Sequence, residues 1–458
     1  MTIEFTAVEL AERAIYRRAV EAFLWGIPAV NFELLYQSLV RAKGAWNQVA
    51  YWSRLPTWKN QTLTPNPDVI YLFPFFNTQD VGPVVLEIPA AGDGSITGSV
   101  DDGWQVALED VGPAGVDKGK GGKYLILPPG YNDKFPDGYI PMPSVTYAGY
   151  AILRSNLKSG SDADVAKGVA YGKRVRIYPL TQTANPPATT FVDVIDVLYD
   201  NIIPYDVRFF ELLNSFVQRE PWLERDKVMI DYLKSIGIEK GKAFQPDAST
   251  RSMLEEASRE VSAWIDVKYE EVYATPYFSG TRWAVPAMPE VIEGMQTSFG
   301  KSDSYPVSDR GVLYSYIYFS AKHLGTGQFY VMTIKDKQGQ SFESANTYRL
   351  NVPANPPVSL YWSATVYDRA THAYSRGQSR FSCSSLTPGL QKNADGSVDV
   401  YFGSQAPAGK ESNWVPTNRE GQFEVLFRFY GPQKALFDKT WKLSDIELAA
   451  AGDVKKVA

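Results

Sequence analysis

The sequence predicts an α+β fold in which β structure dominates. Aromatic residues make up 14% of the 458 residues, and 35 Gly and 30 Pro accompany them, which is typical of many short strands joined by turns. Apolar residues recur at helical spacing near the N-terminus and again in the middle of the chain. Short apolar runs separated by turn residues fill two other stretches, from about 46 to 154 and from about 290 to 430.

The N-terminal segment, residues 1–44, is predicted to be helical. Thr6 can cap the helix, and the apolar residues that follow have helical spacing. The Gly26–Pro28 sequence is expected to kink the chain, because proline cannot donate the hydrogen bond of a helix interior. The helix is expected to resume over residues 30–40.

Residues 45–190 are predicted to form a β-sandwich domain, and residues 191–304 a helical insertion. The sandwich is expected from apolar runs that lie between turns at antiparallel spacing, at 69–76, 84–88, 124–127 and 147–153. The insertion is expected from apolar stripes at 205–217, 226–236 and 249–269.

Residues 305–445 are predicted to form a second β domain at the C-terminus. Several of its apolar runs alternate in polarity, as half-buried strands do. Its strongest strands are expected at 313–319, 328–334, 358–367, 398–402 and 423–430.

Charge and composition exclude several classes of function. The 46 Lys and Arg and 51 Asp and Glu give a net charge of −5, with both signs spread along the chain, so we expect no nucleic-acid partner. No run of 18 apolar residues occurs, so we expect no membrane-spanning helix. The N-terminus lacks the features of a signal peptide, which leaves a cytoplasmic protein and a mature exported protein as alternatives.

Side-chain counts restrict metal and cofactor sites. The chain has one cysteine, Cys383, and two histidines, His323 and His372. A closed zinc site normally takes four such ligands, and an iron–sulfur cluster takes several thiolates, so we expect no metal and no cofactor. His372 follows a predicted strand in a polar stretch, a loop position that slightly favours a functional role. No Gly-x-Ser-x-Gly nucleophile motif accompanies it.

The most unusual segment is 63–71, Leu-Thr-Pro-Asn-Pro-Asp-Val-Ile-Tyr. Two prolines fix the backbone around Asn66, and Asp68 leads directly into an apolar strand that contains Tyr71. We predict a site here, with Asp68 and Tyr71 as catalytic residues and Asn66 as a ligand-binding residue. Strand alternation would send Asp68 and Tyr71 to opposite faces, so the prediction requires a bend after Pro67. A purely structural, turn-locking role is the alternative.

Residues of other strands are predicted to complete this site. We expect Arg154 to bind an anionic group, Trp104 to stack on the ligand, and Asp102 to act as a further catalytic carboxylate. Two alternatives remain open. Asp102 can belong to a solvated turn before the strand at Gln105. Asp68 can accept backbone amides and form a buried ion pair with Arg154, with no substrate at all.

Several motifs occur in an order that resembles a two-domain family. In the first part of the chain they resemble the domain of unknown function 1254, and these motifs are Ala22–Pro28, Thr64–Tyr71, Gly82–Val85, Gly112–Tyr124, Arg154 and Ile236–Gly241. Those that follow resemble the domain of unknown function 1214, and they are Tyr361–Asp368, Asn393–Ser397, Asn413–Pro416 and Phe423–Pro432.

The resemblance covers roughly residues 15–445, and what it implies is mostly architecture. Family members resemble tandem β-sandwich and jelly-roll domains with helical insertions, so the resemblance implies a jelly roll in the C-terminal domain. Many members carry export signals, which implies a periplasmic or secreted protein. The resemblance assigns no chemistry.

Two functions from different classes are compatible with these features. The first is an exported enzyme that acts on a small or sugar-like molecule in an aromatic-lined cleft with carboxylate, tyrosine and arginine groups. The second is a non-catalytic ligand-binding or structural protein whose aromatic residues build cores and an oligomer interface. A deep pocket near Asp68 that holds a ligand or a group with a strongly shifted pKa favours the first, and a broad flat apolar patch in its place favours the second. The aromatic excess and the jelly-roll resemblance predict a homodimer.

Overall fold

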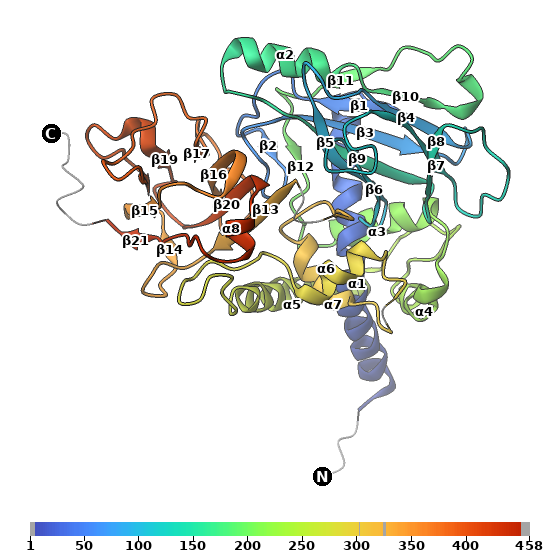
Figure 1. The fold of residues 1–458 in the computed structure, drawn as a ribbon. Helices are drawn as coiled ribbons and strands as arrows, with labels where there is room; N and C mark the ends of the chain where they lie inside the picture. Colours follow the sequence, from blue (N-terminus) through green and yellow to red (C-terminus); the bar gives the residue numbers. More distant parts are fainter. Residues whose placement is uncertain (1–4, 302, 324–326, 450–458) are drawn as a thin grey trace.

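The computed structural model describes residues 5–301, 303–323 and 327–449. An N-terminal and a C-terminal β lobe lie side by side, and helices from the middle of the chain lie below them in the view of Figure 1. Helices make up 27% and strands 25% of the structure. The predicted combination of several sheets, an N-terminal helix and a helical middle is therefore confirmed. The first four residues of the predicted segment 1–44 lie outside the described residues.

The first helix, α1 (Ala7–Arg41), begins at the outer end of the molecule and is buried over most of its second half. Thr6 and Glu9 form a capping box, in which each side chain bonds the backbone N–H of the other. This pair satisfies two of the amide groups that a helix leaves free at its start. The predicted N-terminal cap is confirmed.

The helix does not restart after Gly26–Pro28 as expected, because α1 continues through Pro28. Proline leaves the carbonyl of Leu24 without its helical partner. Helix α7 (Val307–Tyr314) packs directly against that carbonyl, and a Cβ on Gly311 would lie 2.9 Å from the Leu24 oxygen. Close tertiary packing therefore holds the helix together where local propensity favours a break.

The N-terminal lobe is a sandwich of two sheets with strand orders β11-β1-β3-β9-β5-β6 and β10-β4-β7-β8. Strand β3 is buried on both faces, with Leu72 in the sandwich core and Tyr71 in the core shared with α1. A short pair, β2 (Asn60–Gln61) and β12 (Tyr199–Asp200), and helix α2 (Asp162–Gly172) flank the sheets. The strands are β1 (Gln48–Tyr51), β3 (Ile70–Asn77), β4 (Val84–Ile88), β5 (Ile96–Asp102), β6 (Ala107–Val111), β7 (Gly122–Leu127), β8 (Tyr139–Pro143), β9 (Ala148–Ser155), β10 (Arg176–Pro179) and β11 (Phe191–Asp193).

The helical middle surrounds α1 and covers one face of the larger sheet. Its apolar side chains join those of α1 and β3 in a single core, so α1 is enclosed by parts of the chain that follow it by up to 300 residues. Besides α7, the helices are α3 (Arg208–Arg219), α4 (Lys227–Ser235), α5 (Ala248–Val272) and α6 (Pro289–Gln296).

The C-terminal lobe has two sheets whose facing side chains share one core. One sheet has the order β13-β20-β16-β17 with β14 also paired to β20, and the other the order β19-β18-β15-β21. The jelly-roll connectivity stays a prediction. The strands are β13 (Gln328–Thr333), β14 (Phe342–Glu343), β15 (Tyr348–Val352), β16 (Val358–Asp368), β17 (Ser382–Ser384), β18 (Val398–Gly403), β19 (Trp414–Pro416), β20 (Gln422–Pro432) and β21 (Glu447–Leu448). Helix α8 (Lys434–Phe437) follows β20 in the chain.

One predicted strand is wrong. The apolar run 313–319 contains the end of α7 and then an extended stretch that pairs with no sheet among the described residues. Its aromatic side chains pack in the helical core or line the cavity described below. This explains why the run is as apolar as a strand. Within the described residues, no helix combines the length and the apolar character needed to cross a bilayer.

Candidate ligand-binding cavity

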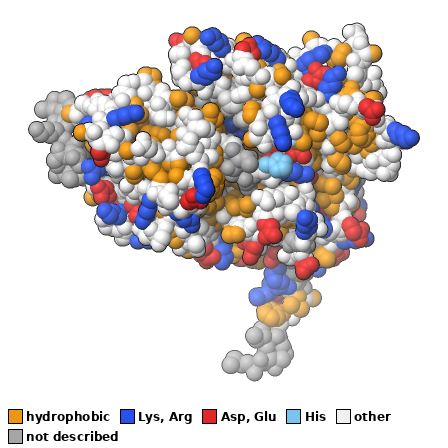
Figure 2. All heavy atoms as spheres, viewed as in Figure 1, with side chains coloured by type: hydrophobic (Ala, Val, Ile, Leu, Met, Phe, Trp, Pro, Cys, Tyr) orange, Lys and Arg blue, Asp and Glu red, His pale blue; other side chains and the backbone are white. Residues whose placement is uncertain are grey.

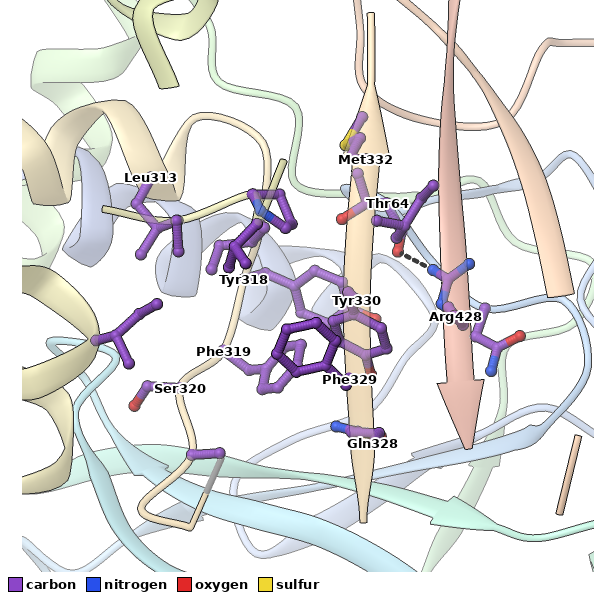
Figure 3. Close-up of a pocket in the computed structure, with 18 of the residues that line it drawn as sticks. Thr64, Leu313, Tyr318, Phe319, Ser320, Gln328, Phe329, Tyr330, Met332 and Arg428 are labelled. Atoms are coloured by element: carbon purple, nitrogen blue, oxygen red, sulfur yellow. Dashed lines mark hydrogen bonds between the residues drawn. The ribbon is translucent and has the colours of Figure 1, made fainter. Parts of the chain in front are cut away.

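A cavity of about 330 Å³ lies between the two lobes, and we call it the interlobe cavity. Its walls come from the segment before β3, from β9, from α6, α7 and the stretch after α7, and from β13 and β20. Figure 3 shows aromatic side chains from the stretch after α7 and from β13 gathered around it. Most of the lining is apolar, as in typical small-molecule sites. Besides tyrosines, the polar lining residues are Thr64, Asn66, Arg154, Gln296, Ser320, Gln328 and Arg428.

Arg154 is a buried cation without an anionic partner. It lies on β9 directly opposite Tyr71 of β3 and is 3% exposed. Its guanidinium carbon lies 4.9 Å from the ring centre of Phe319 and 5.7 Å from that of Tyr71. Its Nε has no hydrogen-bond partner, and no carboxylate of the described residues forms an ion pair with it. Burial of an uncompensated charge is costly, so this side chain is set up to receive an anion.

Arg428, the second arginine of the cavity, is fully engaged by the protein. Its guanidinium donates to the carbonyl oxygens of Thr64 at 2.9 Å and Pro65 at 3.2 Å. It also donates to the hydroxyls of Thr365 at 2.8 Å and Tyr367 at 2.5 Å. The first of these bonds is drawn in Figure 3. Arg428 therefore fixes the segment before β3 to the C-terminal lobe.

Asn66 links the two lobes from the other side. Its side-chain amide donates to the hydroxyls of Tyr430 at 2.7 Å and Tyr361 at 3.0 Å. Its backbone N–H donates to the hydroxyl of Tyr71 at 2.8 Å, and its side-chain oxygen accepts from the backbone of Asp68 at 3.0 Å. The two prolines thus aim Asn66 at the neighbouring lobe, and the segment is a structural link that also borders the cavity.

Two tyrosines that line the cavity with Arg154, Tyr318 and Tyr330, are neutral hydrogen-bonding groups. Burial raises the pKa of Tyr318 well above its usual value, with a further contribution from Tyr71 and an opposing one from Arg154. Burial likewise raises the pKa of Tyr330, with Tyr430 adding to the effect. Both phenols therefore stay protonated near neutral pH and can donate to an anion that Arg154 binds.

The structure brings together three of the six predicted site residues, because Asn66, Tyr71 and Arg154 all line the interlobe cavity. Asp68 does not join them. It faces a separate cleft of about 320 Å³, where the hydroxyl of Ser382 donates to its two oxygens at 3.3 and 3.2 Å. Burial raises the pKa of Asp68 to about 6, against the lowering effects of Arg428, Ser382 and Arg380. No ion pair joins Asp68 to Arg154 among the described residues.

Asp102 and Trp104 are also placed away from the cavity. Asp102 lies opposite Gly149 on β9, five residues from Arg154 and therefore about 17 Å along the strand. Its carboxylate accepts the backbone N–H groups of Trp104 at 2.8 Å and Val106 at 3.0 Å. The Trp104 ring is 4% exposed and packs 4.7 Å from that of Trp25. The predicted grouping is corrected accordingly: these two residues form a buried turn and part of the helical core.

Sequence reasoning missed the residues that the C-terminal lobe contributes. Tyr330 and Arg428 come from β13 and β20, and Phe319 from a run predicted as a strand. A signal for Arg428 was present, because this arginine lies between Phe427 and Phe429 in a strand that is otherwise apolar. A lone charge in such a strand needs a specific partner.

The comparisons with known families match the two lobes. Residues 46–179 match a protein of unknown function (DUF1254), and residues 327–434 match a second one (DUF1214). The chain belongs to this two-domain family. The DUF1254 range contains Asn66, Tyr71 and Arg154, and the DUF1214 range contains Tyr330 and Arg428. The interlobe cavity is therefore assembled from both domains.

Two solved structures are similar to the DUF1254–DUF1214 chain. The VPA0106 protein from Vibrio parahaemolyticus has a TM-score of 0.58 and 16% sequence identity, over 95% of this chain and 100% of that one. A putative uncharacterized protein from Burkholderia cenocepacia has a TM-score of 0.45 and 10% identity, over 96% and 95% of the two chains. The first likeness supports the fold. The search of curated proteins found no match.

Proposed function

We propose that this DUF1254–DUF1214 protein binds a small molecule with an anionic group and a mainly apolar body in the interlobe cavity. The observation that carries the proposal is the buried guanidinium of Arg154, whose Nε lacks a partner while the cavity opens beside it. A bound carboxylate would supply the missing charge and accept a charge-assisted hydrogen bond. The phenol of Tyr330 lines the same cavity and, because burial raises its pKa, stays protonated and can serve as a second donor.

The lining favours binding over the carboxylate-based catalysis that we considered. None of the described residues that line the cavity is an Asp, Glu, His, Lys or Cys, so a carboxylate acid–base pair is lacking there. A sugar would need many polar partners, whereas this lining is mostly apolar and aromatic. An enzymatic role would have to use tyrosine and arginine alone. Asp68, whose pKa is raised to about 6, lies in the separate cleft, so for the interlobe cavity the non-catalytic ligand-binding function is the better supported of our two candidates.

The proposal is tested by calorimetric titration with matched acids and amides. Octanoate and benzoate share their apolar bodies with octanamide and benzamide, so any preference reports the anionic group. We expect the acids to bind at least tenfold more tightly than the amides, and Arg154→Met to remove this preference. Arg174→Gln is the matched control, because Arg174 is exposed and pairs with Asp93 at the surface. Equal binding of acid and amide by the unaltered protein would contradict the proposal.

The cellular location and assembly of the protein are proposals of the same kind. A periplasmic or secreted location and the C-terminal jelly roll are supported by the family resemblance, and a homodimer by the aromatic excess. Both signs of charge are interspersed over the face shown in Figure 2, in agreement with a partner that is not a nucleic acid. Fractionation of cells that express the natural gene tests the location.

A further inference from the structure

A polar cleft of about 500 Å³, separate from the interlobe cavity, lies between the helical middle and the C-terminal lobe. Residues of α5, the turn after β16 and the start of β20 border it. His372 lies in that turn and lines the cleft, as do the side chains of Arg369 and Asp266. Unlike the interlobe cavity, this cleft therefore contains an imidazole, the side chain that most often serves as a general base.

His372 is held in one orientation by its backbone. Its φ is +53°, in the left-handed region, where histidine is found more often than most residues other than glycine. Its N–H donates to the carbonyl of Asp368 at 2.8 Å, and its own carbonyl accepts the N–H of Thr64 at 2.6 Å. These two bonds fix the turn that carries His372 against the segment before β3.

The imidazole has the surroundings of a catalytic base. Its Nδ1 lies 2.9 Å from a carboxylate oxygen of Glu424, a residue with no exposed surface. The other oxygen of Glu424 accepts the hydroxyl of Tyr269 at 2.6 Å, and the Tyr269 ring lies 4.6 Å from the imidazole. Nε2 of His372 has no hydrogen-bond partner among the described residues, and it is not fully buried. A carboxylate on one ring nitrogen orients the other for proton transfer.

Arg369 can stabilise negative charge in the same cleft. Its guanidinium packs 4.3 Å from the ring centre of Tyr269. Its ion pair with Asp266 is long, at 3.7 Å, and the described residues accept no side-chain hydrogen bond from it. Its donors are therefore available to a ligand. The remaining charged side chains that border the cleft belong to Glu270 and Asp368.

We propose that this cleft is a hydrolytic site for small carboxylic esters, with His372 as its general base. Nε2 takes a proton from a water molecule while the water oxygen bonds to the acyl carbon, and Arg369 stabilises the negative charge that forms on the carbonyl oxygen. The acyl C–O bond then breaks, and His372 returns the proton to the departing alcohol. Glu424 and Tyr269 act as positioning residues. This site is independent of anion binding in the interlobe cavity.

The test uses p-nitrophenyl acetate and two matched histidine variants. His372→Asn suits the left-handed backbone, and its amide can replace Nδ1 as the donor to Glu424 while Nε2 is lost. We expect hydrolysis by the unaltered protein to exceed that by His372→Asn at least tenfold, and His323→Asn, at an exposed position, to retain the full rate. Equal rates for the unaltered protein and His372→Asn would overturn the proposal.

Two measurements remain informative if His372→Asn fails to fold. Diethyl pyrocarbonate should modify His372 in the folded, unaltered protein, and absence of that modification would overturn the proposal, because it would show Nε2 to be inaccessible. Nitrogen NMR of ¹⁵N-histidine protein should show His372 protonated at Nδ1 and unprotonated at Nε2. Glu424→Gln should reverse this tautomer and lower the hydrolysis rate, whereas a merely structural glutamate would leave both unchanged.

Discussion

Arg154 and Arg428 are both buried, and both line the interlobe cavity, yet their replacement by methionine is expected to have different effects on stability. The difference follows from their partners. Arg428 donates hydrogen bonds to four oxygen acceptors, whereas Arg154 has ring contacts and an unpartnered Nε.

The magnitude for Arg428→Met comes from the acceptors that it leaves behind. The Tyr367 hydroxyl still donates to the carbonyl of Pro65 at 2.5 Å, and the Thr365 hydroxyl can rotate. The Thr64 carbonyl loses its partner outright, and Pro65 keeps only one. With about 1–3 kcal/mol for each unsatisfied buried group, the variant should lose about 3 kcal/mol of unfolding free energy.

Arg154→Met removes a desolvated charge and fills a similar volume with apolar atoms. Replacement of buried charges by well-packed apolar residues is often neutral, or stabilising by about 1–4 kcal/mol. Loss of the contacts with the Tyr71 and Phe319 rings costs about 1 kcal/mol each. The two effects nearly cancel, so we expect a change within about 1 kcal/mol of zero.

Urea denaturation followed by tryptophan fluorescence at pH 7, without added ligand, measures both variants against Arg174→Gln. The reasoning requires a lower urea midpoint for Arg428→Met and an unchanged or higher one for Arg154→Met. An equal loss in the two variants would refute it, because Arg154 would then have a stabilising partner that offsets its burial.

Four further outcomes are expected. Because burial raises the pKa of Asp68 to about 6, above the value of an unfolded carboxyl, the folded protein binds this proton more tightly and loses stability as pH rises from about 4 to 6. In urea titrations, Asp68→Asn should therefore be as stable as the unaltered protein at pH 4 and more stable at pH 8, by at most about 3 kcal/mol. A less stable variant at pH 8 would contradict this. Asn66→Ala should cost about 2–3 kcal/mol, because two tyrosine hydroxyls of the C-terminal lobe lose their donor, and calorimetry showing an unchanged melting temperature would exclude a linking role. Gly311→Ala should lower the free energy of unfolding by at least about 2 kcal/mol, because the new Cβ would meet the Leu24 carbonyl. Gly160→Ala is the control and should leave stability unchanged, because its Cβ would meet no atom within 4 Å. Equal melting temperatures of the two variants would count against the close packing of α1 and α7. Light scattering should give twice the 51.1 kDa chain mass, and the mass of one chain would rule out the homodimer.

Local patterns were sufficient to predict most elements but insufficient to place the site. Periodicity predicts α3 and α4 to within a few residues, because each presents a clear apolar stripe to the core. The run 313–319 is ambiguous, because side chains that line a cavity and side chains of a buried strand are equally apolar. Continuation of α1 through Pro28 depends on the packing of Gly311, which lies almost 300 residues away in the chain. Prediction from local sequence patterns does not include so distant a partner.

The same limit applies to the site residues. Two prolines around Asn66 indicate a rigid segment, and the structure shows such a segment in contact with the other lobe. Alternation along the chain correctly separates Asp68 from Tyr71, whereas the proposed bend after Pro67 does not bring them into one cavity. Asp102 and Trp104 were chosen for their chemistry alone, and their burial in a turn and in the helical core follows from packing partners such as Trp25.

The position of α1 has a consequence for synthesis of the chain. The ribosome makes this helix before α7, which covers it at Leu24 and ends at residue 314. At roughly 5–20 residues per second, about 15 s to a minute passes between the synthesis of α1 and that of α7. During that interval Ile27, which is fully buried in the finished protein and lies 3.6 Å from the position of a Cβ on Gly311, remains uncovered by α7. Nascent chains of this protein should therefore depend on chaperones that bind apolar helices, and removal of residues 1–44 would leave the later elements without the surface around which they assemble.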